Sequence, residues 1–337
     1  MTVCLTGLGT YVPDRVVTGE AVAAESGIPV DVVTEKMGVR EKHVCPPDDD
    51  HATDMCVAAA EEALADADVD PGSLDLVLYH GSEYKDYVVW SAAANVADRL
   101  GAEHAYATES YTLCAGAPVA LRQVRAQLET GDVDSALLVA ASREEDLVDY
   151  GDEDASFMFN FGSGASAYVL ERNAGDRARA TVRESAAVTD GSFAADVVMP
   201  AGGSRNPPSE RTIGEGLHAL TVTSDDMKDR MADVSGPNFL SVADDALERS
   251  GLAREDLDFA AVTHMKRSFH EWLVGELGLG DDGHHYLDEY GHVQSVDQAL
   301  ALREGLAAGT VADGDVVLFL AAGTGYTWSA TVLEWRD

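Results

Sequence analysis

The sequence has few cysteines, few lysines and no long apolar run. Its 337 residues include four cysteines and five lysines. The cysteines show no CxxC or other metal-ligand spacing, and they are too few for a disulfide scaffold in a chain of this length. No apolar run approaches a membrane span, and the first residues lack the basic flank of a signal peptide. We therefore expect a soluble, cytoplasmic protein without a metal site and without a membrane partner.

Acidic residues dominate the charge of the chain. There are 60 aspartates and glutamates against 23 lysines and arginines, which gives a formal net charge of −37. Such a charge repels nucleic acid and anionic membranes, and it destabilises the compact state unless salt screens it. The composition thus excludes nucleic acid as a partner. It predicts a halophilic protein adapted to a salt-rich cytoplasm, as in halophilic archaea.

Strand patterns alternate with amphipathic helix patterns along the chain. Apolar strands are expected at residues 3–9, 74–79 and 136–141, and helices at 52–67 and 90–100, with two short helices between 18 and 37. The unbroken apolar run at 136–141 is typical of a strand buried on both faces of a sheet. This alternation predicts an α/β protein.

An internal repeat divides the chain into two similar halves. The pattern of helix, acidic loop and strand at 63–78 returns at 246–261, and residues 134–141 are echoed by 315–322 at nearly the same offset. Two echoes at nearly equal offsets indicate a duplication. We therefore predict two α/β halves, residues 1–175 and 176–337.

Cys114 is the candidate nucleophile. It precedes a helical pattern that closes at Gly131, so it is expected at a helix N-terminus, where free N–H groups and the helix dipole favour a thiolate. Ala115 and Gly116 leave room for a substrate carbonyl. The alternative is a buried structural cysteine, which is a common place for a free thiol.

The second half offers partners for this cysteine. The strand at 257–262 runs into His264, and the strand at 315–320 runs into a glycine-rich loop at 321–325. Strand C-terminal ends are where α/β folds place their chemistry. We expect Cys114, His264, His292 and this loop to converge between the halves.

Several motifs together resemble those of the type III ketoacyl synthases of the thiolase superfamily. They are GLGTYVP (7–13), MGVREKH (37–43), CAG (114–116), FGSGASA (161–167), YGH (290–292) and GTGYTW (323–328). The resemblance covers essentially the whole chain. It implies a five-layered αβαβα fold of two duplicated halves that forms a homodimer, in agreement with the repeat.

The resemblance implies a role for each candidate residue. Cys114 matches the nucleophile that takes an acyl group from a thioester, and His264 matches the histidine that polarises the carbonyl of the second substrate. Backbone N–H groups of Cys114 and Thr324 would form an oxyanion hole. The third catalytic residue of type III enzymes is an asparagine after Tyr-Gly. Here it is His292, as in the Cys-His-His set of the elongating ketoacyl synthases.

Substrate contacts are less well matched to the family. Many type III enzymes hold the adenine of coenzyme A with a tryptophan and an arginine, where this chain has Val32 and Lys36. Lys266 and Arg267 could meet a phosphate of a pantetheine arm or a carrier protein. The candidate substrate-binding residues are Lys36, Lys266, Arg267, Gly323 and Gly325. The resemblance implies coenzyme A or carrier-protein thioesters as substrates and no permanently bound cofactor.

The implied activity is that of an acyltransferase. It would condense an acyl group on Cys114 with a malonyl-type thioester to give a 3-ketoacyl product. The loop at 321–325 lacks the second cysteine of thiolases, which argues against a non-decarboxylative thiolase. Two alternatives stay open: a hydroxymethylglutaryl-CoA-synthase-like or ester-forming acyltransferase that uses Glu83, and a non-catalytic scaffold subunit of a thiolase-like complex.

Two further residues are interpreted structurally. Asp297 could orient an imidazole, but we prefer to interpret it as the cap of a helix at 297–307. His270 is expected at the surface or in packing. The run at 161–167 indicates close backbone packing around the site rather than a phosphate loop, because no lysine follows it.

Overall fold

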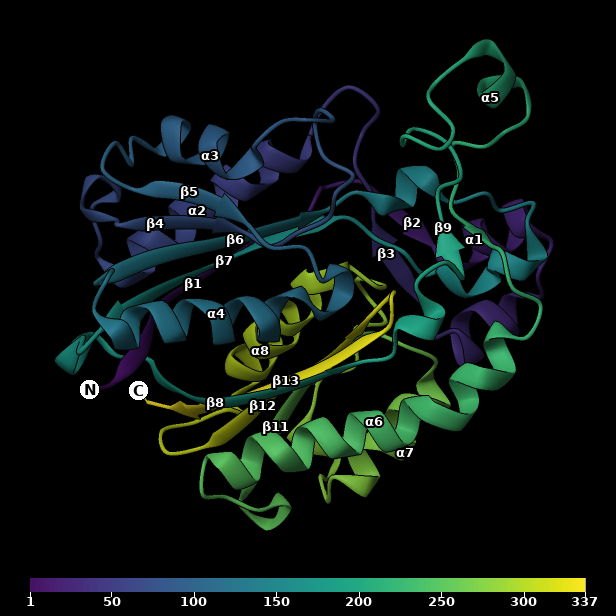
Figure 1. Cartoon of the computed structure of the whole chain (residues 1–337). Coiled ribbons are helices and arrows are strands. Elements are labelled where there is room, and N and C mark those ends of the chain that lie inside the picture. Colours follow the sequence, from purple (N-terminus) through teal and green to yellow (C-terminus); the bar gives the residue numbers. More distant parts are fainter. Residues whose placement is uncertain (337) are drawn as a thin grey trace.

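Three layers of helices enclose two layers of strands in the computed structural model, which describes residues 1–336 (Figure 1). Helices α2 (Ala52–Ala67) and α3 (Ala92–Leu100) cover one outer face, and α6 (Met227–Arg249) and α7 (Arg267–Glu276) cover the other. Helices α4 (Gly116–Thr130) and α8 (Asp297–Ala308) lie between the two strand layers. The expected αβαβα architecture is confirmed.

The strands divide into two layers. The first contains β1 (Val3–Tyr11), β4 (Leu76–Tyr79), β5 (Tyr106–Glu109), β6 (Ser135–Ser142) and β7 (Gly164–Arg172). The second contains β8 (Ala180–Thr189), β11 (Phe259–Val262), β12 (Val316–Gly323) and β13 (Thr327–Trp335).

Strand pairing shows the duplication directly. In the first layer, β4 is parallel to β6, and β7 is antiparallel to β6 and β1. In the second layer, β11 is parallel to β12, and β13 is antiparallel to β12 and β8. The layers join where Cys4 and Leu5 of β1 pair with Thr181 and Ala180 of β8. The boundary after residue 175 stays a prediction; it falls in the connection from β7 to β8.

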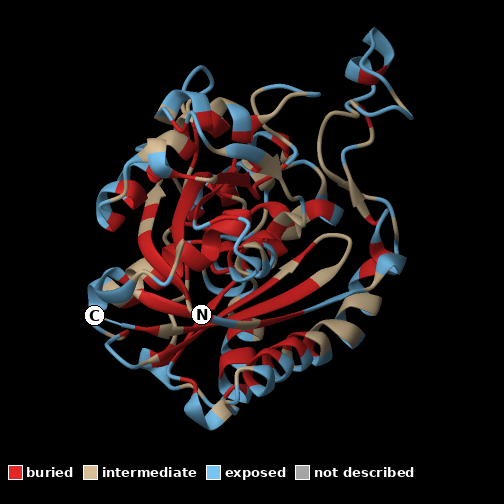
Figure 2. Ribbon diagram, turned by 60° about the vertical axis from the view of Figure 1, so that its left-hand side comes forward, coloured by how far each residue is buried: buried red, intermediate tan, exposed pale blue. Residues whose placement is uncertain are grey.

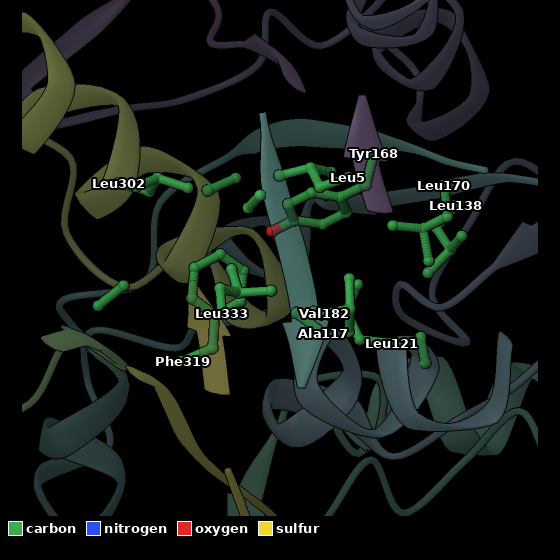
Figure 3. Close-up of a cluster of buried hydrophobic side chains, with 14 of the residues drawn as sticks. Leu5, Ala117, Leu121, Leu138, Tyr168, Leu170, Val182, Leu302, Phe319 and Leu333 are labelled. Atoms are coloured by element: carbon green, nitrogen blue, oxygen red, sulfur yellow. The ribbon is translucent and has the colours of Figure 1, made fainter. Parts of the chain in front are cut away.

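Each helix layer packs on the strands through its own apolar cluster. In the central cluster, Leu121 and Leu302 of the inner helices pack with Leu138 and Phe319 of the two strand layers (Figure 3). The outer clusters join α2 and α3 to the first layer, and α6 and α7 to the second. Burying one such side chain contributes about 1.5–3 kcal/mol. Figure 2 shows the resulting burial along the central strands. All eight residues of β6 are buried.

Most local predictions agree with the elements. Helix α2 spans the expected residues 52–67. Helix α3 begins at Ala92 rather than at residue 90, because the side chain of Ser91 accepts the N–H of Ala94 and caps the helix there. Gly131 ends α4 with a φ of 83°, a left-handed conformation that glycine adopts without strain.

The smaller elements lie together at one end of the molecule (Figure 1). They include β2 (Val16–Thr18), α1 (Gly19–Ser26), a π-helical turn at Val32–Lys36 and β3 (Glu41–His43). Between β9 (Val197–Val198) and β10 (Thr221–Val222), an arm that carries α5 (Glu210–Gly214) projects from the body (Figure 1).

Within residues 1–336, no helix is long and apolar enough to cross a membrane. The same residues contain no group of three or more histidine, cysteine, aspartate or glutamate side chains that could hold a metal ion.

Candidate active site

Cys114 lies in a short 3-10 turn, Leu113–Ala115, that leads directly into α4. Leu113 has a φ of 50°, a left-handed conformation that is strained for a residue with a branched side chain and is found preferentially at functional sites. A side chain at Gly116 would come within 2.6 Å of the carbonyl oxygen of His80. The turn and the small residue after the cysteine thus hold the sulfur at the positive end of α4.

His292 and Asp297 complete a chain of contacts with this sulfur. The Nε2 atom of His292 lies 3.1 Å from the Sγ of Cys114, and its Nδ1 lies 2.6 Å from Oδ2 of Asp297. Burial alone would lower the pKa of His292, but the Asp297 carboxylate and the Cys114 sulfur together raise it well above its usual value. The geometry is that of an activated nucleophile: cysteine, base and an acid that orients the base.

Asp297 does not cap α8, so the preferred interpretation of this residue was wrong. Its Oδ1 accepts the backbone N–H of Val293 at 2.7 Å, and its Oδ2 accepts the backbone N–H of His264 at 2.8 Å as well as His292. The carboxylate is fully buried at the first position of the helix. The tertiary fold surrounds it with donors from two segments, residue 264 and residues 292–293, and these satisfy it in place of the N–H groups of the helix itself.

His264 lies at the end of β11, buried beside the other histidine. Its Nε2 is 3.1 Å from the carbonyl oxygen of Gly38, and its Nδ1 is 3.0 Å from Nδ2 of Asn160. The ring packs against Tyr286 with the centroids 5.0 Å apart. Burial lowers the pKa of His264 to about 4, so the imidazole is neutral at neutral pH.

Sequence reasoning missed Asn160 and Lys42. Asn160 interrupts the otherwise apolar run FMFNF at 157–161, which was the available signal. Lys42 is fully buried, and its Nζ donates to the carbonyl oxygens of Phe159 at 3.0 Å and Phe161 at 2.6 Å. Burial lowers the pKa of Lys42 to about 8. Nothing local marks this lysine, because its acceptors lie more than a hundred residues away in the chain.

Gly323 lies against the backbone of the nucleophile. A Cβ atom there would come within 2.9 Å of the backbone nitrogen of Cys114 and 2.7 Å of that of Ala115. Thr324 follows on the cavity wall. The glycine keeps open the space in front of the N–H of Cys114, whereas the N–H of Ala115 donates to the carbonyl oxygen of Thr112 at 3.1 Å. This is the place that an oxyanion hole requires.

A cavity of about 240 Å³ opens above these residues. Its polar lining includes Cys114, Asn160, Thr263, His264, His292 and Thr324, and Lys266 lies on its exposed rim. The remaining wall is mainly apolar and includes Phe157, Phe161, Met231, Phe239, Phe269 and Tyr326. A cavity with an apolar wall and a few convergent polar groups suits a ligand with a hydrocarbon part and one reacting carbonyl.

Five of the predicted site residues lie outside the cavity wall: Lys36, Glu83, Arg267, Gly323 and Gly325. Lys36 is exposed, although Met37 beside it lines the cavity. The guanidinium of Arg267 pairs with Asp288 at 2.7 Å and lies over the ring of Tyr286.

Glu83 and His270 both lie outside the cavity wall. Glu83 is exposed, in a turn where the Ser82 hydroxyl accepts the N–H of Tyr84. His270 is buried in packing, which is one of its two expected places, with its Nε2 3.1 Å from Nδ1 of His284.

Family models match two parts of the chain. The model of the 3-oxoacyl-[acyl-carrier-protein (ACP)] synthase III family matches residues 109–191, and that of the C-terminal part of the same family matches residues 247–335. The first range contains Cys114 and Asn160, and the second contains both site histidines, Asp297 and the glycine-rich loop. The matched ranges together account for about half of the chain.

Relatives and solved structures match the chain over its whole length. The β-ketoacyl-[acyl-carrier-protein] synthase III of Bradyrhizobium sp. is 28% identical over 338 residues, which is 98% of each chain. That of Symbiobacterium thermophilum is 29% identical over 332 residues, which is 98% of this chain and 97% of the relative.

Two solved structures illustrate the shared fold. The 3-oxoacyl-(acyl carrier protein) synthase III of Pseudomonas aeruginosa PAO1 superposes with a TM-score of 0.86 at 24% identity, covering 100% of this chain and 99% of that one. The priming β-ketosynthase of the R1128 polyketide biosynthetic pathway gives a TM-score of 0.86 at 25% identity, with 100% and 97% covered. The chain therefore belongs to the 3-oxoacyl-[acyl-carrier-protein] synthase III family of the thiolase superfamily, a family of acyltransferases.

Proposed function

We propose that this protein joins an acyl group, carried on Cys114, to a malonyl-type thioester and so makes a 3-ketoacyl thioester. The observation that carries this proposal is the contact of Cys114 with His292 and Asp297 at the base of an apolar cavity. Membership of the 3-oxoacyl synthase III family supports the same reaction.

In the first half-reaction, His292 takes the thiol proton and Asp297 stabilises the imidazolium that forms. The Cys114 thiolate attacks the carbonyl carbon of an acyl thioester. The oxygen becomes negative in front of the N–H groups beside Gly323, which stabilise it. The bond to the donor sulfur then breaks, and the donor leaves as a thiol with the proton that His292 returns. Cys114 now carries the acyl group as a thioester.

In the second half-reaction, the malonyl-type thioester loses its carboxylate as CO₂. The electron pair of the broken carbon–carbon bond passes into an enolate, whose oxygen needs hydrogen-bond donors because it is costly to form in water. The enolate carbon attacks the acyl carbonyl on Cys114, and the thiolate leaves as the new carbon–carbon bond forms. The wall beside His264 faces this second substrate.

The donor thioester is proposed to enter past Lys266. This lysine is exposed on the cavity rim beside the buried site, in a chain where lysine is rare. A phosphate of a pantetheine arm is the group that such a cation attracts. We propose coenzyme A thioesters as donors, because the strong negative charge of the chain repels a large acidic partner. Competition between acyl-CoA and acyl-carrier-protein donors tests this choice.

A homodimer is supported by an exposed edge next to the site. Strand β5 lies at the end of the strand order, and an unpaired edge is normally covered or blunted. The neighbouring residues Tyr87, Val88 and Val89 are 67%, 81% and 105% exposed. We propose that a second copy pairs along β5 and covers these side chains. Light scattering of the Val88→Glu variant should then show a monomer where the unaltered protein is a dimer.

The test of the activity is intact-mass spectrometry with a series of acyl-CoAs. The protein should gain the mass of one acyl group, and Cys114→Ala should gain none. Addition of malonyl-CoA should then release a 3-ketoacyl product. Absence of an adduct with every thioester would favour the scaffold alternative. Unchanged turnover in Glu83→Ala is expected and separates this reaction from one that relies on that glutamate.

A further inference from the structure

We propose that Asn160 is a catalytic residue of the condensation step and donates a hydrogen bond from its side-chain amide to the oxygen of the second thioester. This inference rests on the proposed function and assigns the donor that the second substrate needs. Asn160 lines the cavity together with Cys114, His264 and His292.

The starting point is the hydrogen bonding of His264. Its Nε2 faces the carbonyl oxygen of Gly38 at 3.1 Å, and a carbonyl only accepts, so Nε2 must carry the proton. A neutral imidazole has one N–H. Its Nδ1 is then an acceptor, and the amide nitrogen of Asn160 at 3.0 Å donates to it. The opposite amide orientation would place a lone pair of Asn160 Oδ1 against the lone pair of His264 Nδ1.

This arrangement leaves His264 without an N–H for a substrate. Protonation would supply a second N–H, but burial holds the pKa of His264 at about 4. The Asn160 nitrogen has two N–H groups, and only one of them is used on His264. Among residues 1–336, His264 is the acceptor found for this nitrogen, so its other N–H is available to the cavity.

The backbone holds this amide in place. The Asn160 carbonyl oxygen accepts the N–H of His292 at 2.8 Å, and Phe161 forms a bridge with His292. On the other side, Lys42 donates to the carbonyl oxygens of both neighbours of Asn160. The residue is therefore fixed to the nucleophile's base through its own main chain, and a donor held in advance in this way is what stabilises developing charge.

Stability alone does not account for an asparagine here. The side chain is only 7% exposed, and its Oδ1 has no hydrogen-bond partner among the described residues. An amide that leaves half of its bonding capacity unused in a buried site is less favourable than an apolar side chain of the same size. The residues around it in the run FMFNF are apolar. The cost of this amide points to a role other than stability.

His292 is the other buried imidazole on the cavity wall. In this protein His292 is bound to Asp297 and Cys114 through its two ring nitrogens, so it serves the nucleophile. The amide donor is then supplied from the segment before β7, on the far side of His264.

The experiment measures the two half-reactions separately in two variants. Asn160→Leu removes the amide and keeps the branching and the number of heavy atoms of the side chain. Asn160→Asp replaces the donor by a carboxylate, which obliges His264 to bind a proton on Nδ1 beside Asp297 and Asp288, the other acids near it. Gln298→Leu is the matched control, because Gln298 is a buried amide outside the cavity wall. Acylation of Cys114 by acyl-CoA is followed by intact mass, and condensation by product release after mixing acylated enzyme with malonyl-CoA.

Asn160→Leu is expected to acylate Cys114 within about threefold of the unaltered rate and to condense about 10²–10³-fold more slowly, the usual effect of losing one such donor. Asn160→Asp should condense slowly and with an altered pH profile. Condensation at the unaltered rate in Asn160→Leu would overturn the proposal, as would equal loss of both half-reactions. If Asn160→Leu does not fold, an unaltered pH profile in Asn160→Asp has the same consequence. Failure of the unaltered protein to acylate at all would instead refute the proposed function.

Discussion

Replacing Asp297 by asparagine tests the nucleophile most directly. The variant keeps the shape of the side chain but loses its charge, and part of its surface becomes a donor. The amide oxygen can still accept a backbone N–H, whereas its nitrogen would face Nδ1 of His292 or the N–H of His264. His292 is then driven to the tautomer with its proton on Nε2, where it donates to Cys114 instead of accepting the thiol proton.

The size of the effect follows from the two histidines. Both are buried, yet the pKa of His292 is raised well above its usual value while that of His264, without a carboxylate on its ring, is about 4. Without the charge of Asp297, burial would bring the pKa of His292 toward that of His264. Each pKa unit that His292 loses corresponds to about 1.4 kcal/mol and about tenfold less thiolate–imidazolium pair at neutral pH. The acylation rate should fall by the same factor.

The assay is rapid quenching of an acyl-CoA reaction, with the Cys114 adduct measured by intact mass from pH 6 to 9. In Asp297→Asn, the rate should also rise with pH, because the thiolate must now form without its base. The matched control is Asp75→Asn. Asp75 likewise accepts two backbone N–H groups, those of Asp134 and Ser135, and it lies just before the first residue of β4. Acylation by Asp297→Asn within threefold of the unaltered rate would refute the reasoning.

Three further predictions follow from the structure. Gly323→Ala should slow both half-reactions by about 10²-fold or more, because its Cβ would displace the backbone of the oxyanion site; unaltered kinetics would remove this loop from the mechanism. Acid should destabilise the fold: burial lowers the pKa of His80 and His270 to about 3 and that of His264 to about 4, so the unfolded chain takes up protons below about pH 6.5 that the folded one does not. Each of these three histidines should reduce the free energy of unfolding by about 2 kcal/mol between pH 7 and 5, and the raised pKa of His292 offsets only a small part of this; urea unfolding should therefore show a net loss of stability, and a gain would contradict the reasoning. The net charge of −37 predicts a melting temperature that rises steeply from low salt to multimolar KCl, and full stability at low salt would contradict the halophilic interpretation.

Sequence patterns determined the fold and the nucleophile, because both have local causes. The apolar run of β6 and the periodic pattern of α2 are properties of single elements. The repeat then allowed the elements of the second half to be predicted from those of the first. Cys114 was found from the small residues and the helix that follow it. The strand ends of the second half pointed to partners for it, and the family motifs then gave His264 and His292 their roles.

Tertiary structure decided which groups work together. The contact of Cys114 with His292 joins residues 178 positions apart, and that of Asn160 with His264 spans 104. Asp297 was interpreted as a helix cap because a short acid at a helix start fits that pattern, but only packing brings the N–H groups of His264 and Val293 to it. Glu83 fits a family pattern and yet lies in solvent. Hydrogen-bond partners depend on how the layers pack against each other. A local sequence pattern does not predict which distant residues this packing brings into contact.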